Sequence, residues 1–149
     1  MPLSSTVTNM AGYHYKLQII PGNSEIFVDE NYWLNEQPNS LMLNKFRELL
    51  PIDCKWGETE EFRSEENHSV LCIWWENHKV WNLQFEYAPV CKGEDALLNQ
   101  VLALCIEYGY MLYSEQTETV VAPNKNELWQ NFKKCSQYEI YEKRLNEFH

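Results

Sequence analysis

The chain has 149 residues, a length that suits one domain spanning 1–149 with a substantial buried core. Hydrophobic residues make up 44% and aromatic residues 14%, which excludes an intrinsically disordered protein. The 22 acidic residues outnumber the 12 basic ones, and the formal net charge of −10 disfavours nucleic acid or an anionic membrane as a partner. The same charge favours a basic partner, although acidity can also serve only to keep a protein dissolved.

The cysteines and the N-terminal residues predict a cytoplasmic protein. The cysteines are odd in number and show neither a C-x-x-C pair nor zinc-finger spacing, so we expect free thiols in a reducing compartment and no metal site. The first residues lack the charged and apolar regions of a signal peptide, and no apolar run approaches the ~20 residues of a membrane helix. The five cysteines are Cys54, Cys72, Cys91, Cys105 and Cys135.

The N-terminal third predicts one or two strands and a helix. Residues 1–12 are small and polar, and we expect them to be flexible. Residues 13–20, YHYKLQII, alternate between apolar and polar positions, which predicts a half-buried strand. Residues 25–28, EIFV, are a second candidate strand. Asn39 or Ser40 can cap a helix, whose apolar stripe is Leu41, Leu43, Phe46, Leu49 and Leu50.

The middle of the chain contains the clearest pattern, a β-hairpin at Val70–Glu76 and Val80–Tyr87. The second arm alternates, which places one set of its side chains in the core, whereas the first arm is apolar on both sides and predicts a central strand. Residues 52–69 are less regular and are compatible with a charged edge strand. The predicted core side chains of the second arm are Trp81, Leu83, Phe85 and Tyr87.

The C-terminal third predicts a helix, a short strand pair and a second helical region. The helix covers Glu94–Tyr108, with Gly109 as its C-terminal cap. The strand pair is YMLY and TVVA around the turn SEQTE. Asn124 begins a capping sequence for a final helix or broken helix, on which Leu128, Phe132, Cys135 and Leu145 share a face. Together these elements predict a single α+β domain, an antiparallel sheet with a central aromatic-rich hairpin packed by helices mainly on one face.

The sequence contains no established catalytic or cofactor motif. No phosphate-binding glycine loop, G-x-S-x-G, H-E-x-x-H or EF-hand pattern is present, so we expect no cofactor. A pairing of His68 with Cys54 or Cys72, or a pair of glutamates, leaves a small enzyme as the third interpretation.

A glutamate-rich segment and several tryptophans supply the candidate partner-binding residues. Glutamates that surround an aromatic anchor are typical of a protein-binding hot spot with a charged rim. The alternative is a solvated edge, with the tryptophans packed as loop anchors. The adjacent Trp74 and Trp75 must point to opposite faces of their strand, so if helices cover only one face, one of them is expected to be exposed or to lie under a loop. The candidate residues are Glu58, Glu60, Glu61, Glu65, Glu66, Trp56, Trp33 and Trp74.

From about residue 70 to 130, the chain resembles the C-terminal half of small bacterial immunity proteins, which neutralise toxins of contact-dependent and type VI secretion systems. In many of these proteins a helix ends in a glycine and an aromatic residue. A strand with an aromatic residue, a glutamine, a turn, a second strand and a proline then precede the last helix. The matching positions here are Gly109, Tyr110, Tyr113, Gln116, Val120, Val121 and Pro123.

The resemblance implies a non-enzymatic inhibitor that binds a cognate toxin protein acting in the cytoplasm. The acidic charge is compatible with a toxin that has a basic active-site cleft, such as a nuclease, which the inhibitor would occlude. The alternative from the residues alone is a regulatory or adaptor module with an endogenous protein partner, and a phage origin is one version of this alternative.

Overall fold

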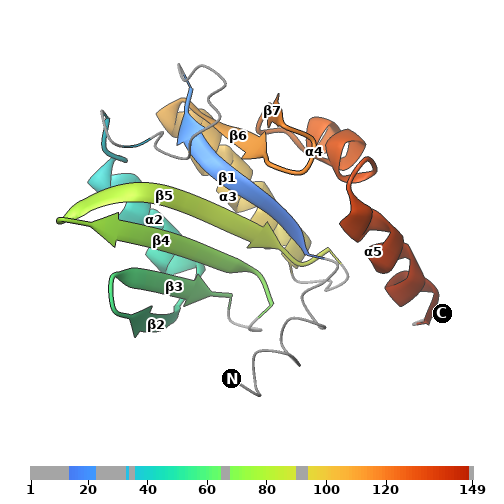
Figure 1. Ribbon diagram of the computed structural model, residues 1–149, viewed down its shortest axis with the longest axis horizontal. Coiled ribbons are helices and arrows are strands. Elements are labelled where there is room, and N and C mark those ends of the chain that lie inside the picture. The colour runs from blue at the N-terminus through green and yellow to red at the C-terminus, as the bar shows by residue number, and fades with distance from the viewer. Residues whose placement is uncertain (1–13, 23–32, 34–35, 65–67, 90–93, 148–149) are drawn as a thin grey trace.

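The computed structural model describes residues 14–22, 33, 36–64, 68–89 and 94–147, which form the fold in Figure 1. The expectations for residues 1–12 and 25–28 therefore lie outside the described residues. One antiparallel sheet of seven strands organises the described chain, in the order β2-β3-β4-β5-β1-β6-β7. Its strands are β1 (Tyr15–Pro21), β2 (Ile52–Trp56), β3 (Thr59–Arg63), β4 (Val70–Glu76), β5 (Lys79–Tyr87), β6 (Tyr110–Ser114) and β7 (Thr119–Val121).

Four described helices accompany the sheet: α2 (Ser40–Leu49), α3 (Glu94–Tyr108), α4 (Lys125–Phe132) and α5 (Ser136–Glu147). Figure 1 shows α2 and α3 behind one face of the sheet, and α4 and α5 beside the end that carries β6 and β7. The predicted α+β fold class is confirmed, including the helices that lie mainly on one face.

The predicted hairpin is confirmed as β4 and β5, joined by a two-residue turn between Glu76 and Lys79. The turn residues Asn77 and His78 have φ angles of 52° and 65°, in the left-handed region. Two successive residues of this kind match the right-handed twist of the flanking strands, which is why such turns are preferred in tight hairpins. His78 is therefore an exposed turn residue.

The core lies between the sheet and the two helices α2 and α3. Leu71 of β4 and Leu17 of β1 both pair with Phe85 of β5, so the three side chains lie on the same face. From the helices, the core receives mainly Met42, Leu43 and Phe46 of α2 and Leu97, Leu98, Val101, Leu102 and Cys105 of α3.

Two expectations about burial are wrong in detail. We expected β1 to be half-buried, but its side chains are buried on both faces apart from Lys16. β1 is an interior strand between β5 and β6, and Gln18 and Ile20, which alternate with the core residues Leu17 and Ile19, are nearly as buried as these. In α2 the stripe is shifted, since Leu41 is 63% exposed and Met42 is buried.

The helix boundaries follow the predicted caps. The side-chain oxygen of Asn39 accepts a hydrogen bond from the backbone N–H of Leu41 at 2.9 Å, and that of Asn124 accepts one from Glu127 at 2.8 Å. These bonds satisfy amides that a helix start otherwise leaves unpaired. Gly109 ends α3 with a φ of +73°, a conformation that favours glycine. The final helical region is broken into α4 and α5.

Candidate functional site

Trp56 is the most exposed aromatic anchor among the predicted partner-binding residues, with 58% of its surface accessible. It ends β2, the edge strand of the sheet, in the less regular segment for which the sequence allowed an edge strand and which forms the β2–β3 hairpin. Its indole Nε1 donates to the sulfur of Cys54 at 3.2 Å. Since residues two apart in a strand share a face, this contact orients the indole along its own strand.

Trp56 belongs to a row of tryptophans that crosses the sheet. Trp56 pairs with Thr59 of β3, and Thr59 pairs with Trp74 of β4, so the three residues share one face. The next residue, Glu60, contacts Arg47 of α2 and therefore points to the face covered by helices. Because side chains alternate along a strand, the tryptophans lie on the opposite face, called the open face below.

Trp81 extends this row, which corrects its predicted place in the core. The pairing register shifts between Trp74, which pairs with Asn82, and Trp75, which pairs with Val80. Trp81 is the extra residue of this bulge, and a bulge turns one side chain to the other face. Its ring lies 6.2 Å from that of Trp74, and both rings are half-buried. No local feature of the sequence marks this bulge, so alternation alone misplaced Trp81.

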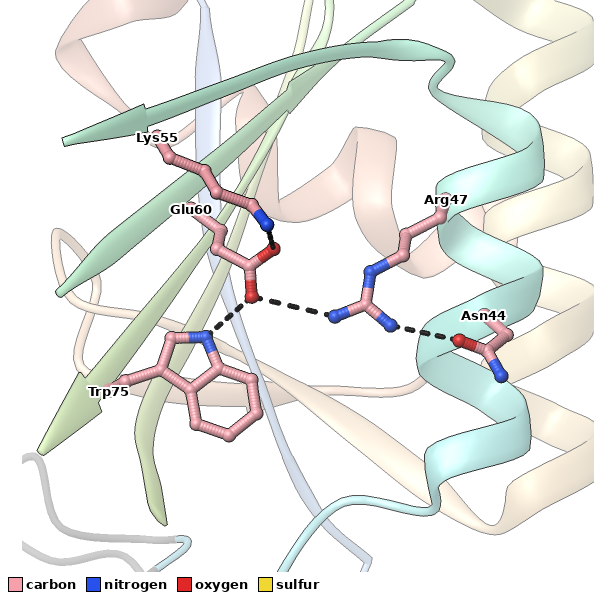
Figure 2. Close-up of polar contacts among 5 residues, drawn as sticks. All are labelled: Asn44, Arg47, Lys55, Glu60 and Trp75. Atoms are coloured by element: carbon pink, nitrogen blue, oxygen red, sulfur yellow. Dashed lines mark hydrogen bonds and ion pairs between the residues drawn. The ribbon is translucent and has the colours of Figure 1, made fainter. Parts of the chain in front are cut away.

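Glu60, expected at the rim of a binding surface, is part of an internal polar network (Figure 2). Its carboxylate lies 3.5 Å from Arg47 Nη2 and 3.8 Å from Lys55 Nζ. Trp75 Nε1 donates to Glu60 at 2.8 Å, and Arg47 Nη1 donates to Asn44 at 2.9 Å. The Glu60 side chain is only 15% exposed, so its role is to join β3 to α2 rather than to attract a partner.

The other predicted glutamates differ in their availability. Glu61 is on the open face, but its carboxylate lies 2.8 Å from Arg63 Nη2 and is 14% exposed. Glu58 is exposed in the β2–β3 turn. Glu65 and Glu66 lie outside the described residues. Within the described part of the chain, the predicted acidic cluster is therefore reduced to Glu58 and to Glu61, whose charge Arg63 compensates.

Trp33 is not available to a partner, which corrects its inclusion in the binding surface. Its side chain is fully buried, its indole Nε1 donates to the backbone oxygen of Ile19 at 2.8 Å, and its ring meets Tyr110 edge-on at 5.0 Å. The indole thus attaches the chain around residue 33 to β1. This is the loop-anchor alternative for Trp33.

The buried cysteines are poor candidates for nucleophiles. Burial and, after it, the nearby carboxylates of Glu86 and Glu61 raise the pKa of Cys72 to about 12. Burial also raises the pKa of Cys105 to about 12 and, to a smaller extent, that of Cys135. A thiol with such a pKa is protonated at neutral pH, and the thiolate is the reactive form. The four described cysteines, which include the exposed Cys54, are free.

The C-terminal positions that carried the resemblance have structural roles. Gln116, expected to be a turn residue, lies after β6 and bonds to the start of α5. Its Oε1 accepts from the backbone N–H of Ser136 at 2.7 Å, and its Nε2 donates to Ser136 Oγ at 3.1 Å. Asn131 of α4 donates to Thr117 in the same turn at 2.8 Å. The turn between β6 and β7 thereby holds α4 and α5 against the sheet.

A scan against family models, a search of curated proteins and a search of solved structures each found no match. Among the described residues, no helix is long and apolar enough to span a membrane. The same residues contain no group of three or more His, Cys, Asp or Glu side chains placed to hold a metal ion.

Proposed function

We propose that this protein is a cytoplasmic immunity protein that binds a cognate secreted antibacterial toxin and occludes its active site. The observation that carries the proposal is the row of Trp56, Trp74 and Trp81 on the open face. Tryptophan is enriched in the few residues that dominate protein–protein binding energy, because one indole removes a large apolar area from water at low entropic cost. A half-exposed row of three has no equivalent benefit for the isolated fold.

The charge of the chain supports a basic partner. A net charge of −10 accelerates encounter with a positively charged surface, such as the active-site cleft of a nuclease. The tryptophan row adds a local reason, because indole faces attract guanidinium and ammonium groups. Exposed Glu58 lies next to this row and would act mainly on the association rate. The charged rim is thus smaller than the sequence suggested.

Binding is favoured over catalysis by the buried cysteines, because of the state of their thiols. Burial keeps Cys72 and Cys105 protonated, whereas a nucleophilic cysteine needs a lowered pKa. Both thiols pack as small apolar side chains in a sheet and a helix.

Co-expression with a toxin tests the proposal directly. The toxin candidates are the C-terminal domains of large secreted proteins encoded beside this gene. We expect one of them to be lethal in a bacterial host alone and harmless together with this protein. If all of the lethal candidates remain lethal, the immunity proposal is wrong. Specific capture of an endogenous protein in that case would favour a regulatory module.

Variants of the tryptophan row locate the binding surface in the complex. Trp56→Ala and Trp81→Ala should each raise the dissociation rate by about 30-fold, equivalent to about 2 kcal/mol. Leu41→Ala is the matched control, since Leu41 is an equally exposed apolar side chain on α2. Unchanged dissociation of both tryptophan variants would place the interface elsewhere.

A further inference from the structure

The outer edge of β2 has no neighbouring strand within the described part of the chain. β2 is the terminal strand of the sheet and pairs with β3 on one side, and Figure 1 shows it as the outermost strand. An edge of this kind can accept another strand through its unpaired backbone N–H and C=O groups. Its exposed side chains are Asp53, Cys54, Lys55 and Trp56.

The β2–β3 hairpin determines which backbone groups of β2 point to the outer edge. Trp56 pairs with Thr59 across a two-residue turn, and the residues that flank such a turn form a hydrogen-bonded pair. Hydrogen-bonded and non-hydrogen-bonded pairs alternate along a hairpin, so the backbone groups of Cys54 also point to β3. Those of Asp53 and Lys55 point to the outer edge. A new strand would therefore bond to these two residues, on either side of Cys54.

The charges of β2 are complementary to those of a second β2 in one antiparallel register. Pairing two copies about Cys54 brings Asp53 of each copy opposite Lys55 of the other. A shift by two residues in either direction would instead place two Asp53 or two Lys55 side chains opposite each other. Among the described residues Asp53 forms no ion pair, and Lys55, whose side chain is 64% exposed, has a contact of 3.8 Å with Glu60. Both charges are therefore available to a second copy.

We propose that β2 pairs antiparallel with β2 of a second copy of this chain, about a two-fold axis at Cys54. Residues directly opposite each other in a strand pair point to the same face, so the open faces of the two copies join into one. Trp56 Nε1 donates to the Cys54 sulfur, so the exposed indoles of both copies flank the axis on that joined face. The paired strands are five residues long, and we expect a dissociation constant on the order of 10 μM.

Sedimentation velocity of the purified full chain, from about 1 to 200 μM, tests this inference. The salt concentration is about 0.15 M, because the net charges of −10 on the two copies are then screened beyond about 8 Å. We expect a particle of twice the mass of one chain at the upper concentrations. A monomer over the whole range would overturn the proposal and leave β2 as an edge that its charges protect.

Charge reversal tests the register. Lys55→Asp and Asp53→Lys each place like charges opposite each other twice, and each should weaken dimerisation by at least about tenfold. The double variant, with both substitutions, restores opposite charges in this register and should dimerise as the wild type does. Lys134→Asp changes an exposed residue between α4 and α5 and should leave dimerisation unchanged. No recovery in the double variant, or equal weakening by Lys134→Asp, would overturn the assigned pairing.

The thiol of Cys54, which is exposed and free, reports the register in the unmodified protein. The two Cys54 residues would form a non-hydrogen-bonded pair with Cα atoms about 4.5 Å apart, a separation that a disulfide can bridge. Diamide accepts two electrons and two protons from two thiols, and we expect it to link the copies at Cys54, as peptide mass spectrometry would show. Lys55→Asp should lower the yield of this link. A dimer without the link, or equal yields from both proteins, would overturn the register.

The pairing is independent of the toxin proposal, because it is measured on the purified protein alone. A monomer that still protects cells from a toxin would overturn this inference and leave the immunity proposal standing. A dimer that protects cells from no toxin would have the opposite meaning.

Discussion

The indole of Trp75 donates a hydrogen bond of 2.8 Å to Glu60, on the face of the sheet that α2 covers. Its neighbour Trp74 points to the open face and contacts Trp81. The two adjacent tryptophans therefore have different roles. Trp75 holds a carboxylate inside the fold, where Arg47 compensates its charge, and Trp74 forms part of a surface.

Removing the Arg47 guanidinium from this network should destabilise the protein. Arg47→Met leaves the 15% exposed Glu60 carboxylate without its guanidinium, and we expect the free energy of unfolding to fall by about 1–3 kcal/mol. Lys45→Met, on the same helix, removes the exposed ion pair with Glu107 and should change stability little, because solvent screens that pair. Urea unfolding of both variants makes the comparison. Equal effects would mean that the Glu60 network is no stronger than a surface pair.

The same substitution should destabilise the protein at Trp33 but not at Trp56. Trp33→Phe removes the donor that satisfies the buried Ile19 carbonyl and leaves unfilled volume, so we expect a loss of about 1–3 kcal/mol in the free energy of unfolding. Trp56→Phe changes an exposed side chain and should leave this free energy within about 0.5 kcal/mol of wild type. Urea unfolding followed by circular dichroism measures both. A destabilised Trp56 variant would show that this indole is structural.

The strand and helix pattern could be predicted because it depends on local spacing. The alternation of Leu83, Phe85 and Tyr87 and the helical stripe of Glu94–Tyr108 each require only neighbouring residues to define a face. The fate of Glu60 could not be predicted in this way. Whether that carboxylate is a rim or an internal contact depends on where α2 places Arg47, and no short-range pattern contains that information.

The candidate site was predictable only in part. Trp56 was a candidate because it stands in a polar segment, and its exposure is compatible with that role. Trp33 stands in an equally polar segment but is buried, since β1 supplies an acceptor for its indole. Trp81 was missed because a bulge changes its face, and a bulge is a property of strand pairing rather than of one strand.

Gly22 should not tolerate a side chain. A Cβ atom at this position would lie 2.1 Å from the backbone oxygen of Gly109, so β1 and the start of β6 would have to separate. We expect Gly22→Ala to lower the free energy of unfolding by about 1–3 kcal/mol. Gly57→Ala, in the β2–β3 turn, is the control for strain without collision, because no heavy atom lies within 4 Å of its Cβ position. Chemical denaturation measures the free energy of unfolding of both variants. A wild-type value for Gly22→Ala would show that Gly22 and Gly109 do not constrain each other.

His14 should make the protein less stable in mild acid. Burial and, after it, electrostatic interactions with His68, Lys16 and Arg63 lower the pKa of His14 to about 4. The unfolded chain takes up this proton below about pH 6.5, whereas the folded protein does not until about pH 4, so stability is lost as the pH falls between these values. The contribution is on the order of 3 kcal/mol and is fully present above pH ~6.5.

Unfolding free energies of wild type and His14→Asn between those two pH values test this linkage. The variant should show a shallower decline, because other groups titrate in both proteins but only wild type carries the buried imidazole. Parallel curves for the two proteins would rule His14 out as the cause.

The interior position of β1, between β5 and β6, has a consequence for the order of folding. Tyr15 pairs with Tyr87 and Pro21 with Tyr110, so β1 is enclosed by strands that are synthesised much later than itself. Closing such long loops costs entropy before any contact compensates for it, which slows folding. A nascent chain that ends before β6 can pair β1 on one side at most. Until β6 has been made, the other edge of β1 stays open to strands of other chains, and chaperones would have to protect it.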